Sequence, residues 1–274
     1  MNAASGQLVR VERAFSKQAA VYDAYEADHP ILKWMRARVH RHVLKYLRPG
    51  DRILELNAGT GTDALFFAAQ GWSVTATDIS AGMVAKMREK IELSGLGGKI
   101  SAKKCSYLNL LSIGAVKFDY IFSDFGGLNC TADLNPVFRQ FSALLTDGGY
   151  VSLVMMPRIC PWELALVLKG HFRTAMRRLH RRGIEAHIEG EYFHTRYYSP
   201  REVMKALGNS FRLIRLEGLG SFTPPPFMEN FPRNYPVLFR RLNQLDEKLC
   251  GFYPFNRWAD HFILTAQFRE KTLK

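Results

Sequence analysis

Features that would assign this sequence to a membrane, secreted or repeat protein are missing from it. No stretch approaches the roughly 20 consecutive apolar residues that a membrane-spanning helix needs. The N-terminal segment MNAASGQLVR does not place a charged start before an apolar core, so we expect no signal peptide. We find no internal repeat and no low-complexity tract. These absences predict a globular cytoplasmic protein.

Cysteine is also scarce, and its spacing excludes any CxxC pair. The four cysteines lie far apart in the sequence, at Cys105, Cys130, Cys160 and Cys250. Disulfide frameworks are typical of small secreted domains, and paired cysteines of metal and redox motifs. We therefore expect four reduced thiols and no metal site.

Acidic residues are too few to balance the basic ones, and the net charge is +13. The excess is confined to the two flanks of the chain. Residues 51–150 carry nine Lys and Arg against ten acids, whereas residues 1–50 carry nine against four and residues 151–274 carry twenty against eleven. Such flanks indicate an anionic substrate, a membrane surface or nucleic acid, or else a solvated basic face without a specific partner.

The most informative stretch that is present covers residues 53–80. An apolar run ends in Glu55 and opens into a loop with Gly59 and Gly61; a helix-like segment follows, and then a second apolar run that ends in Asp78. Glycines allow a ligand to approach the backbone closely, and a carboxylate accepts two hydrogen bonds from a ribose diol. The stretch therefore predicts a site for a nucleoside-containing cofactor.

The surrounding sequence alternates between strand and helix patterns, which is typical of a doubly wound, mostly parallel α/β sheet. Further strands are expected at 99–104, 118–123, 150–156, 211–220 and 260–268. Helices are expected at 8–26, 30–47, 81–94, 133–145, 161–182, 199–208 and 235–250, with an extended segment at 190–198 and an irregular excursion at 222–234.

We expect these elements to form one overall domain in four parts. The parts are an N-terminal helical cap at 1–50, a cofactor-binding core at 51–157, a substrate-pocket insertion at 158–210, and the last two strands with an intervening helical excursion at 211–274.

The glycine loop alone leaves the kind of cofactor open. The run from Gly59 to Ala64 fits the GxGxxA fingerprint of dinucleotide-binding enzymes, so it is compatible with a nicotinamide dehydrogenase. Three other features favour a sulfonium cofactor: the negative charge of Glu55, the motifs SDFGGLNC at 123–130 and LLTDGGYV at 144–151, and the expected pair of final strands. With these motifs the chain resembles the class I S-adenosylmethionine-dependent methyltransferases of the small-molecule type.

The resemblance implies a Rossmann-like methyltransferase fold with seven strands, the last of them antiparallel. It implies S-adenosyl-L-methionine as the cofactor, S-adenosyl-L-homocysteine as the product, and no metal. Asn57 stands where this family more commonly has glycine. The cofactor-binding residues that the resemblance implies are Tyr22, Glu55, Asn57, Ala58, Gly59, Gly61, Asp78, Ile79, Met83, Ser106, Tyr107 and Phe125.

Individual roles follow from the same resemblance. Asp78 would hold the ribose hydroxyls, with Ile79 and Met83 near the adenine. Ser106 and Tyr107 occupy the region where the family usually has an acidic residue that meets the adenine amino group. Tyr22, in the segment AFSKQAAVYDAY, would close over the cofactor.

Candidate catalytic residues follow the fourth and fifth strands. Asp124 begins a run, Asp-Phe-Gly-Gly, that lacks the prolines of enzymes acting on amino groups of nucleic acids. The region after the fifth strand builds the acceptor pocket in the family and contains His194 and Tyr197 here. His194 is the best general base by its intrinsic pKa. We take Asp124, His194 and Tyr197 as the catalytic candidates.

The helix expected at 161–182 presents Lys169, Arg173 and Arg177 at four-residue steps. This basic face has three interpretations: a solvated surface, a contact with anionic lipid or a phosphorylated substrate, and a contact with RNA or DNA. No nucleic-acid module is recognisable.

The sequence thus predicts methyl transfer to a small molecule of lipid-like or natural-product type, anionic or membrane-associated. Its alternatives are an RNA methyltransferase, favoured only by charge, and a non-catalytic protein that binds the cofactor.

Overall fold

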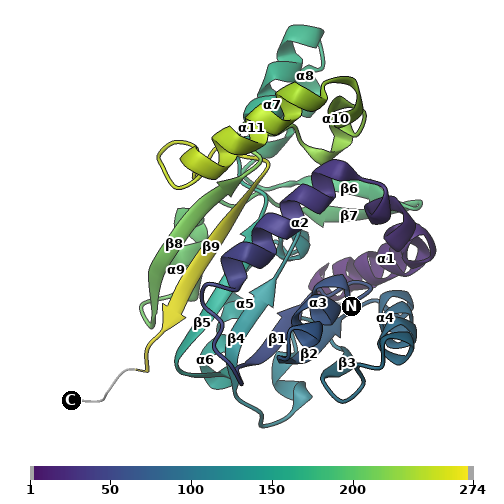
Figure 1. Cartoon of the computed structure of the whole chain (residues 1–274), viewed down its shortest axis with the longest axis vertical. Coiled ribbons are helices and arrows are strands. Elements are labelled where there is room, and N and C mark those ends of the chain that lie inside the picture. The colour runs from purple at the N-terminus through teal and green to yellow at the C-terminus, as the bar shows by residue number, and fades with distance from the viewer. Residues whose placement is uncertain (1–2, 271–274) are drawn as a thin grey trace.

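The computed structural model describes residues 3–270 and is built on one large sheet (Figure 1). Seven strands lie in the order β3-β2-β1-β4-β5-β9-β8. Their bounds are β1 Arg52–Leu56, β2 Ser73–Asp78, β3 Ile100–Lys104, β4 Phe118–Ser123, β5 Leu145–Met155, β8 Phe211–Leu219 and β9 His261–Phe268. Strands β3, β2, β1, β4 and β5 pair in parallel, and β9 runs antiparallel to β5 and β8. The predicted mostly parallel sheet with an antiparallel last strand is confirmed.

Helices cover both faces of the sheet, because successive side chains of a strand point to opposite faces. Ile53 of β1 belongs to one apolar core and its neighbour Leu54 to the other. The helices of the first core are α2 Pro30–Val43, α3 Thr62–Ala69 and α4 Ala81–Ser94, and those of the second are α5 Asn135–Phe138, α6 Phe141–Leu144 and α9 Pro200–Leu207. The central strands are therefore apolar on both faces, as parallel strands usually are.

The strand order creates a place for a ligand. Strand β1 lies between β2 and β4, so the winding direction of the chain reverses beside it. In open α/β sheets ligands bind at such a point, outside the carboxyl ends of the strands. The turn after β1 adopts left-handed backbone at Gly59 (φ 55°) and Gly61 (φ 80°), and α3 begins immediately after it.

Helix α1, Ala3–Ala27, lies at this carboxyl edge. The hydroxyl groups of Ser16 and Ser80 are 2.9 Å apart, which joins α1 to the beginning of α4. The ring of Phe15 lies 5.9 Å from that of Phe193 in a later strand. Helix α1 therefore bridges the sheet and a segment that follows β5.

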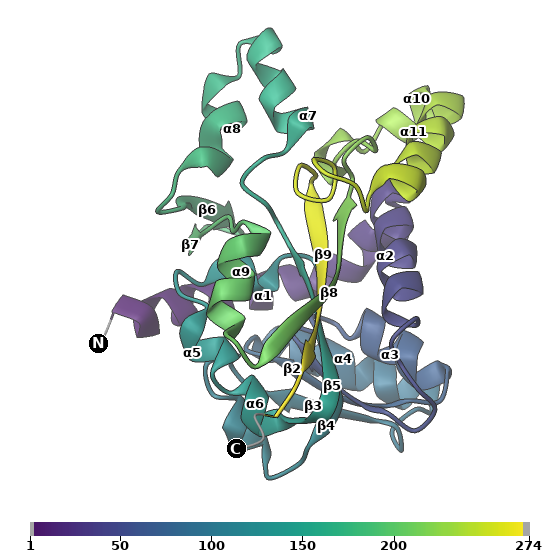
Figure 2. The ribbon, with the colours of Figure 1, turned by 90° about the vertical axis from the view of Figure 1, so that its left-hand side faces the viewer.

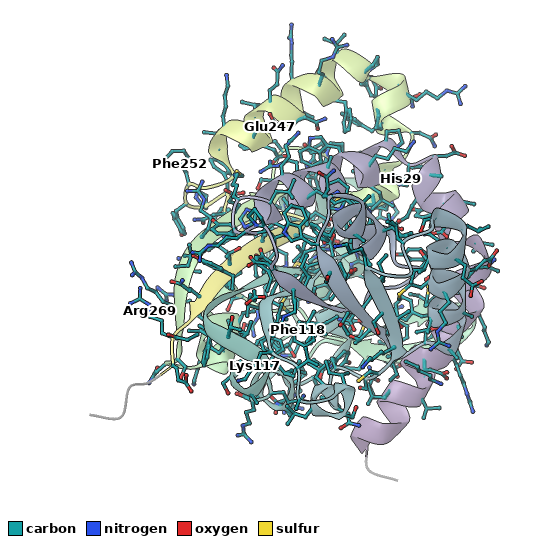
Figure 3. All side chains as sticks on the ribbon, turned by 60° about the horizontal axis from the view of Figure 1, so that its bottom comes forward. His29, Lys117, Phe118, Glu247, Phe252 and Arg269 are labelled. Carbon is teal, nitrogen blue, oxygen red and sulfur yellow. The ribbon has the colours of Figure 1, made fainter. Side chains whose placement is uncertain are left out.

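Lys117 and Phe118, where β4 begins, lie on the opposite side of the molecule from His29 and Glu247 (Figure 3). His29 separates α1 from α2, and Glu247 belongs to helix α11, Pro236–Leu249. The turn between α1 and α2, and the part of α11 that carries Glu247, thus lie on the side of the molecule away from the amino end of β4.

The segment after β5 departs from the sequence prediction. The single helix expected at 161–182 is wrong: the structure has α7 Pro161–Leu164, a 3₁₀ turn at Ala165–Lys169, α8 Phe172–Met176 and a second 3₁₀ turn at Arg177–Leu179. The break occurs at Gly170, whose φ of 78° is incompatible with a continuing α-helix. We call residues 161–179 the arm. The helix expected at 133–145 is likewise divided, into α5 and α6.

A two-stranded hairpin follows the arm. Its strands are β6 Ile184–Ile188, which the sequence did not indicate, and β7 Glu191–Thr195, within the segment expected to be extended. The short helix α10, Phe231–Asn234, and α11 then lie between β8 and β9. The four-part division of the chain stays a prediction.

Within residues 3–270, no helix combines the length and apolar character needed to cross a membrane.

Candidate active site

A cavity of about 410 Å³ opens at the carboxyl ends of β1, β2 and β4, with α1 and the β6–β7 hairpin on its other side. Its sheet side is formed by residues 57–60, 62–63, 78–79, 83, 107, 124–127, 130 and 156. Its opposite side is formed by Val11, Phe15, Gln18, Tyr22, Arg36, Arg177, Ala186, Ile188, Phe193, Thr195 and Tyr197. The cavity therefore joins the predicted cofactor loop to the region after β5.

Asp78 is held in place by its own backbone surroundings. Its Oδ2 accepts a hydrogen bond from the Gly59 amide at 2.9 Å, and its Oδ1 accepts one from the Ser80 amide at 2.8 Å. Burial raises the pKa of the Asp78 carboxyl, although these N–H donors favour its charged form. The carboxylate is thus a fixed acceptor at the cavity wall, as a ribose diol requires.

Asn57 takes the left-handed conformation that the commoner glycine would provide. Its φ is 55°, a region that asparagine tolerates better than most residues. Its side-chain amide donates to Ser123 Oγ at 3.2 Å. A Cβ added at Gly127 would lie 2.6 Å from Asn57 Cβ, so the loops after β1 and β4 are in direct contact. The departure from the family motif therefore preserves the shape of the loop.

A group of acidic side chains lies under this loop. Glu55 and Asp124 are each buried, and their Oε2 and Oδ2 atoms have no hydrogen-bond partner among the described residues. Burial, followed by the nearby charge of Asp63, raises the pKa of both carboxyls well above the usual range. Burial also opposes the ionisation of Asp63, but Arg36 and His40 outweigh it and lower the Asp63 pKa to about 2.

Arg36 supplies the positive charge in this part of the cavity. It reaches in from α2, bonds to Asp63 and Glu26, and places its guanidinium carbon 4.7 Å from the centre of the Phe125 ring. Sequence reasoning missed this residue, because it is one of several basic residues along the same helix.

The far side of the cavity is mostly apolar. Phe15, Ile188 and Phe193 contribute its hydrophobic wall. Two polar side chains stand with them: Tyr197, over which the Arg178 guanidinium lies at 5.3 Å, and Arg177. Arg177 forms a two-pronged ion pair with Glu163, at 2.8 and 2.6 Å. This side is suited to a molecule with an apolar body and one polar or anionic group.

Most of the predicted site residues do meet at the cavity. Those that line it are Tyr22, Asn57, Ala58, Gly59, Asp78, Ile79, Met83, Tyr107, Asp124, Phe125 and Tyr197. Tyr22 lies against the glycine loop, since its Cε1 is 4.0 Å from where a Gly59 Cβ would be.

Four predicted residues do not line the cavity. Glu55 lies below the loop, and Gly61 faces Met87, whose Cγ is 2.5 Å from where a Gly61 Cβ would be. Ser106 Oγ caps its own turn by accepting from the Leu108 amide at 3.2 Å.

His194 is the fourth, and we withdraw it as a general base. Side chains alternate along β7, and it is Phe193 and Thr195 that line the cavity. The His194 ring instead lies by Gly183, where a Cβ would be 2.6 Å from its Nε2.

Cys160, Glu163 and Asp260 lie close enough together to suggest a metal site, but their charges are already balanced. Arg178 Nη2 is 2.7 Å from Glu163 Oε1 and 2.7 Å from Asp260 Oδ1, and His261 also bonds to Asp260. We interpret this group as an ion-pair network that attaches the arm to β9.

Comparison with known proteins adds three findings. The family model for a methyltransferase domain matches residues 53–149. Demethylmenaquinone methyltransferase of Bacteroides fragilis is 29% identical over 149 residues, 53% of this chain and 59% of the relative. The S-adenosyl-L-methionine-dependent Diels-Alderase iliD of a Neonectria species is 36% identical over 107 residues, 39% of this chain and 38% of the relative.

Among solved structures, the Burkholderia thailandensis 1,6-didemethyltoxoflavin-N1-methyltransferase superposes with a TM-score of 0.61 at 15% identity, covering 98% of this chain and 92% of that one. It was crystallised with 1,6-didemethyltoxoflavin and S-adenosylhomocysteine. This likeness extends over the whole fold, whereas the matches to these two curated relatives span less than two thirds of the length of each relative.

Proposed function

We propose that the chain is a class I S-adenosylmethionine-dependent methyltransferase that moves a methyl group from S-adenosylmethionine to a small-molecule acceptor. The observation that carries this proposal is that the Asp78 loop and an apolar acceptor side face one another in one cavity. When bound, S-adenosylmethionine supplies a methyl group activated by its sulfonium, so the protein's tasks are to align the acceptor and exclude water.

Residues of the sheet side fit this cofactor. Asp78 would hold the ribose hydroxyls, Ile79 and Met83 the adenine, and Asn57 and Gly59 the methionine part. The unpartnered carboxyl oxygens of Glu55 and Asp124 suit a cofactor that carries an ammonium and a sulfonium. Arg36, in the same cavity, is placed to attract its carboxylate. Tyr107 replaces the usual acid near the adenine.

The acceptor is proposed to be a largely apolar molecule with one anionic or ionisable oxygen or nitrogen, of a kind that can be membrane-associated. Support comes from the Phe15, Ile188 and Phe193 wall beside Arg177 and Tyr197. Asp124 is our candidate base, because its carboxyl group lines the cavity and its Oδ2 has no hydrogen-bond partner among the described residues. Tyr197 would position the acceptor.

Cytoplasmic location is part of the same proposal. All four cysteines are free thiols in the structure, which suits a reducing compartment.

Similarity to a Diels-Alderase that uses the same cofactor favours one second candidate. The Asp78 loop would then bind the cofactor, and the apolar side would fold a substrate for cyclisation without methyl transfer. RNA is less well supported, because the acceptor side is an apolar pocket and not an open basic groove.

Product analysis separates these functions. Purified protein is incubated with S-adenosylmethionine and either an organic extract of cells or total RNA, and S-adenosylhomocysteine and products are followed by mass spectrometry. We expect S-adenosylhomocysteine to accumulate only with the organic extract, together with a product heavier by one CH₂ group. Products of unchanged mass would indicate the cyclase, and methylated RNA would contradict the small-molecule proposal.

A further inference from the structure

The arm carries large apolar side chains that contact little of the protein. Leu168 is 90% exposed, Phe172 61% and Met176 46%. Leu168 is more exposed than any other large apolar residue of the described chain. Exposed apolar side chains gathered on one element commonly mark an interaction surface.

The charge on the outer side of the arm has one sign. Lys169, His171 and Arg173 are exposed between the apolar residues. The one acid within the arm, Glu163, is 1% exposed and is neutralised by Arg177 and Arg178. Apolar and basic side chains interleaved in this way are typical of segments that lie in a membrane interface.

Helix α11, which lies at the same end of the molecule as the arm, also exposes apolar and basic side chains. Trp162 in α7 donates to the Phe222 carbonyl at 3.1 Å, and its ring lies 6.0 Å from that of Phe231 in α10. Helices α7, α8, α10 and α11 all stand at one end of the molecule (Figures 1 and 2). The exposed side chains of α11 include Val237, Leu238, Arg240 and Arg241.

We propose that this end of the molecule docks reversibly on an anionic membrane surface. The docking residues, which we call the distal surface, are Leu168, Lys169, Phe172, Arg173 and Met176 of the arm and Val237, Leu238, Arg240 and Arg241 of α11. The apolar side chains enter the headgroup region, and the basic side chains bind lipid phosphates.

The position of the cavity gives docking a purpose. Arg177 follows Met176 directly and lines the acceptor side of the cavity. Docking therefore holds the acceptor side of the cavity close to lipid. The acceptor would then come from the membrane. This last step rests on the proposed function, whereas the docking itself does not.

A second copy of the chain fits the distal surface less well. Pairing two distal surfaces would bring Lys169 and Arg173 of one copy toward those of the other, without exposed acids on the arm to compensate. Like charges brought together at an interface oppose association. Phospholipid headgroups provide the negative charge that the surface lacks.

The test is co-sedimentation of the full chain with vesicles of phosphatidylglycerol and phosphatidylcholine, compared with phosphatidylcholine alone. We expect binding only to the anionic vesicles. The pair Leu168→Ser and Phe172→Ser should reduce the bound-to-free ratio by about tenfold or more, since both side chains would enter the interface. The pair Lys169→Glu and Arg173→Glu should abolish the preference for anionic lipid.

Leu93→Ser is the matched control, because Leu93 is 82% exposed but lies on α4. Wild-type protein that fails to bind anionic vesicles would overturn the proposal, as would equal losses in Leu93→Ser and in the arm variants. A dimer in light scattering that the arm variants dissociate, without vesicle binding, would assign the surface to a second copy. Titration of S-adenosylhomocysteine into the same preparations tests the proposed function separately.

Discussion

Asp78 is the residue on which cofactor affinity should depend most. Asp78→Ala would remove a charged acceptor from the ribose and leave the Gly59 and Ser80 amides without their partner. Hydrogen bonds to charged groups contribute about 1.5–3 kcal/mol, so we expect S-adenosylhomocysteine to bind about 10- to 150-fold more weakly in titration calorimetry. Asp78→Asn, which keeps one side-chain oxygen, should lose less. Unchanged affinity in a folded Asp78→Ala protein would refute the assignment.

Because of Glu55 and Asp124, we expect the affinity for the cofactor to depend on pH. Burial raises the pKa of both carboxyls in the free protein, and a cationic cofactor bound in the cavity would lower it again. The free protein then holds more protons than the complex, so binding releases protons and affinity rises with pH between the lowered and the raised pKa. Calorimetry in two buffers of different ionisation enthalpy measures this release. Glu55→Gln should reduce it, and a buffer-independent enthalpy for the wild type would argue against it.

The sequence could predict a site residue when neighbouring residues in the chain determine its position. Asp78 and Asn57 stand at fixed distances from a glycine loop, so the motif located them. His194 was misplaced because a strand alternates its faces, and the phase of β7 is set by contacts with α1 that the sequence does not reveal. Arg36 was missed because only the packing of α2 distinguishes it from the other basic residues of that helix.

At the scale of elements, the loops after β1 and β4 should be energetically coupled. In Gly127→Ala the new Cβ would meet Asn57, and overpacking of this kind costs about 1–3 kcal/mol of unfolding free energy in urea denaturation. In an Asn57→Gly background the cost should be smaller by about 0.5 kcal/mol or more. Gly98→Ala, with nothing within 4 Å, is the control. Additive effects of the two substitutions would show that the loops are independent.

The ion-pair network that attaches the arm to β9 should contribute to the stability of the protein. Arg178→Met would leave Glu163 and Asp260 buried without their shared partner. Breaking a buried ion pair from one side typically costs about 3–5 kcal/mol, which chemical denaturation should detect. Arg173→Met on the exposed side of the same arm should change stability by less than about 0.5 kcal/mol. Equal effects of the two would contradict the network's role.

Helices could be predicted where a helical period of apolar residues lies between residues that cap a helix. Helix α4 has the bounds expected from the sequence, 81–94, because Ser80 and Gly95 cap its two ends. The helix expected at 161–182 was wrong because Gly170 interrupts it, and Leu168 faces solvent instead of the core.

On the scale of the whole molecule, the sheet was predictable because alternating strands and helices allow few topologies. The uneven charge of the flanks was also visible, but its meaning depends on three-dimensional placement. The structure gathers the arm and α11 at one end, and puts the cavity between the sheet and α1. Neither arrangement can be read from the sequence, because β6, β7, α9 and β8 separate the arm from α11 along the chain.

Transfer of label from S-adenosylmethionine tritiated on its methyl group tests most directly whether the protein methylates a small molecule. Wild-type protein is incubated with the labelled cofactor and an organic extract of cells, and the tritium recovered in an organic solvent is counted beside that of Asp78→Ala. We predict enzyme-dependent label in the organic phase for the wild type and a strongly reduced amount for the variant at the same cofactor concentration. Tritium that enters RNA alone, or no transfer by a wild-type protein that binds the cofactor, would contradict a small-molecule methyltransferase.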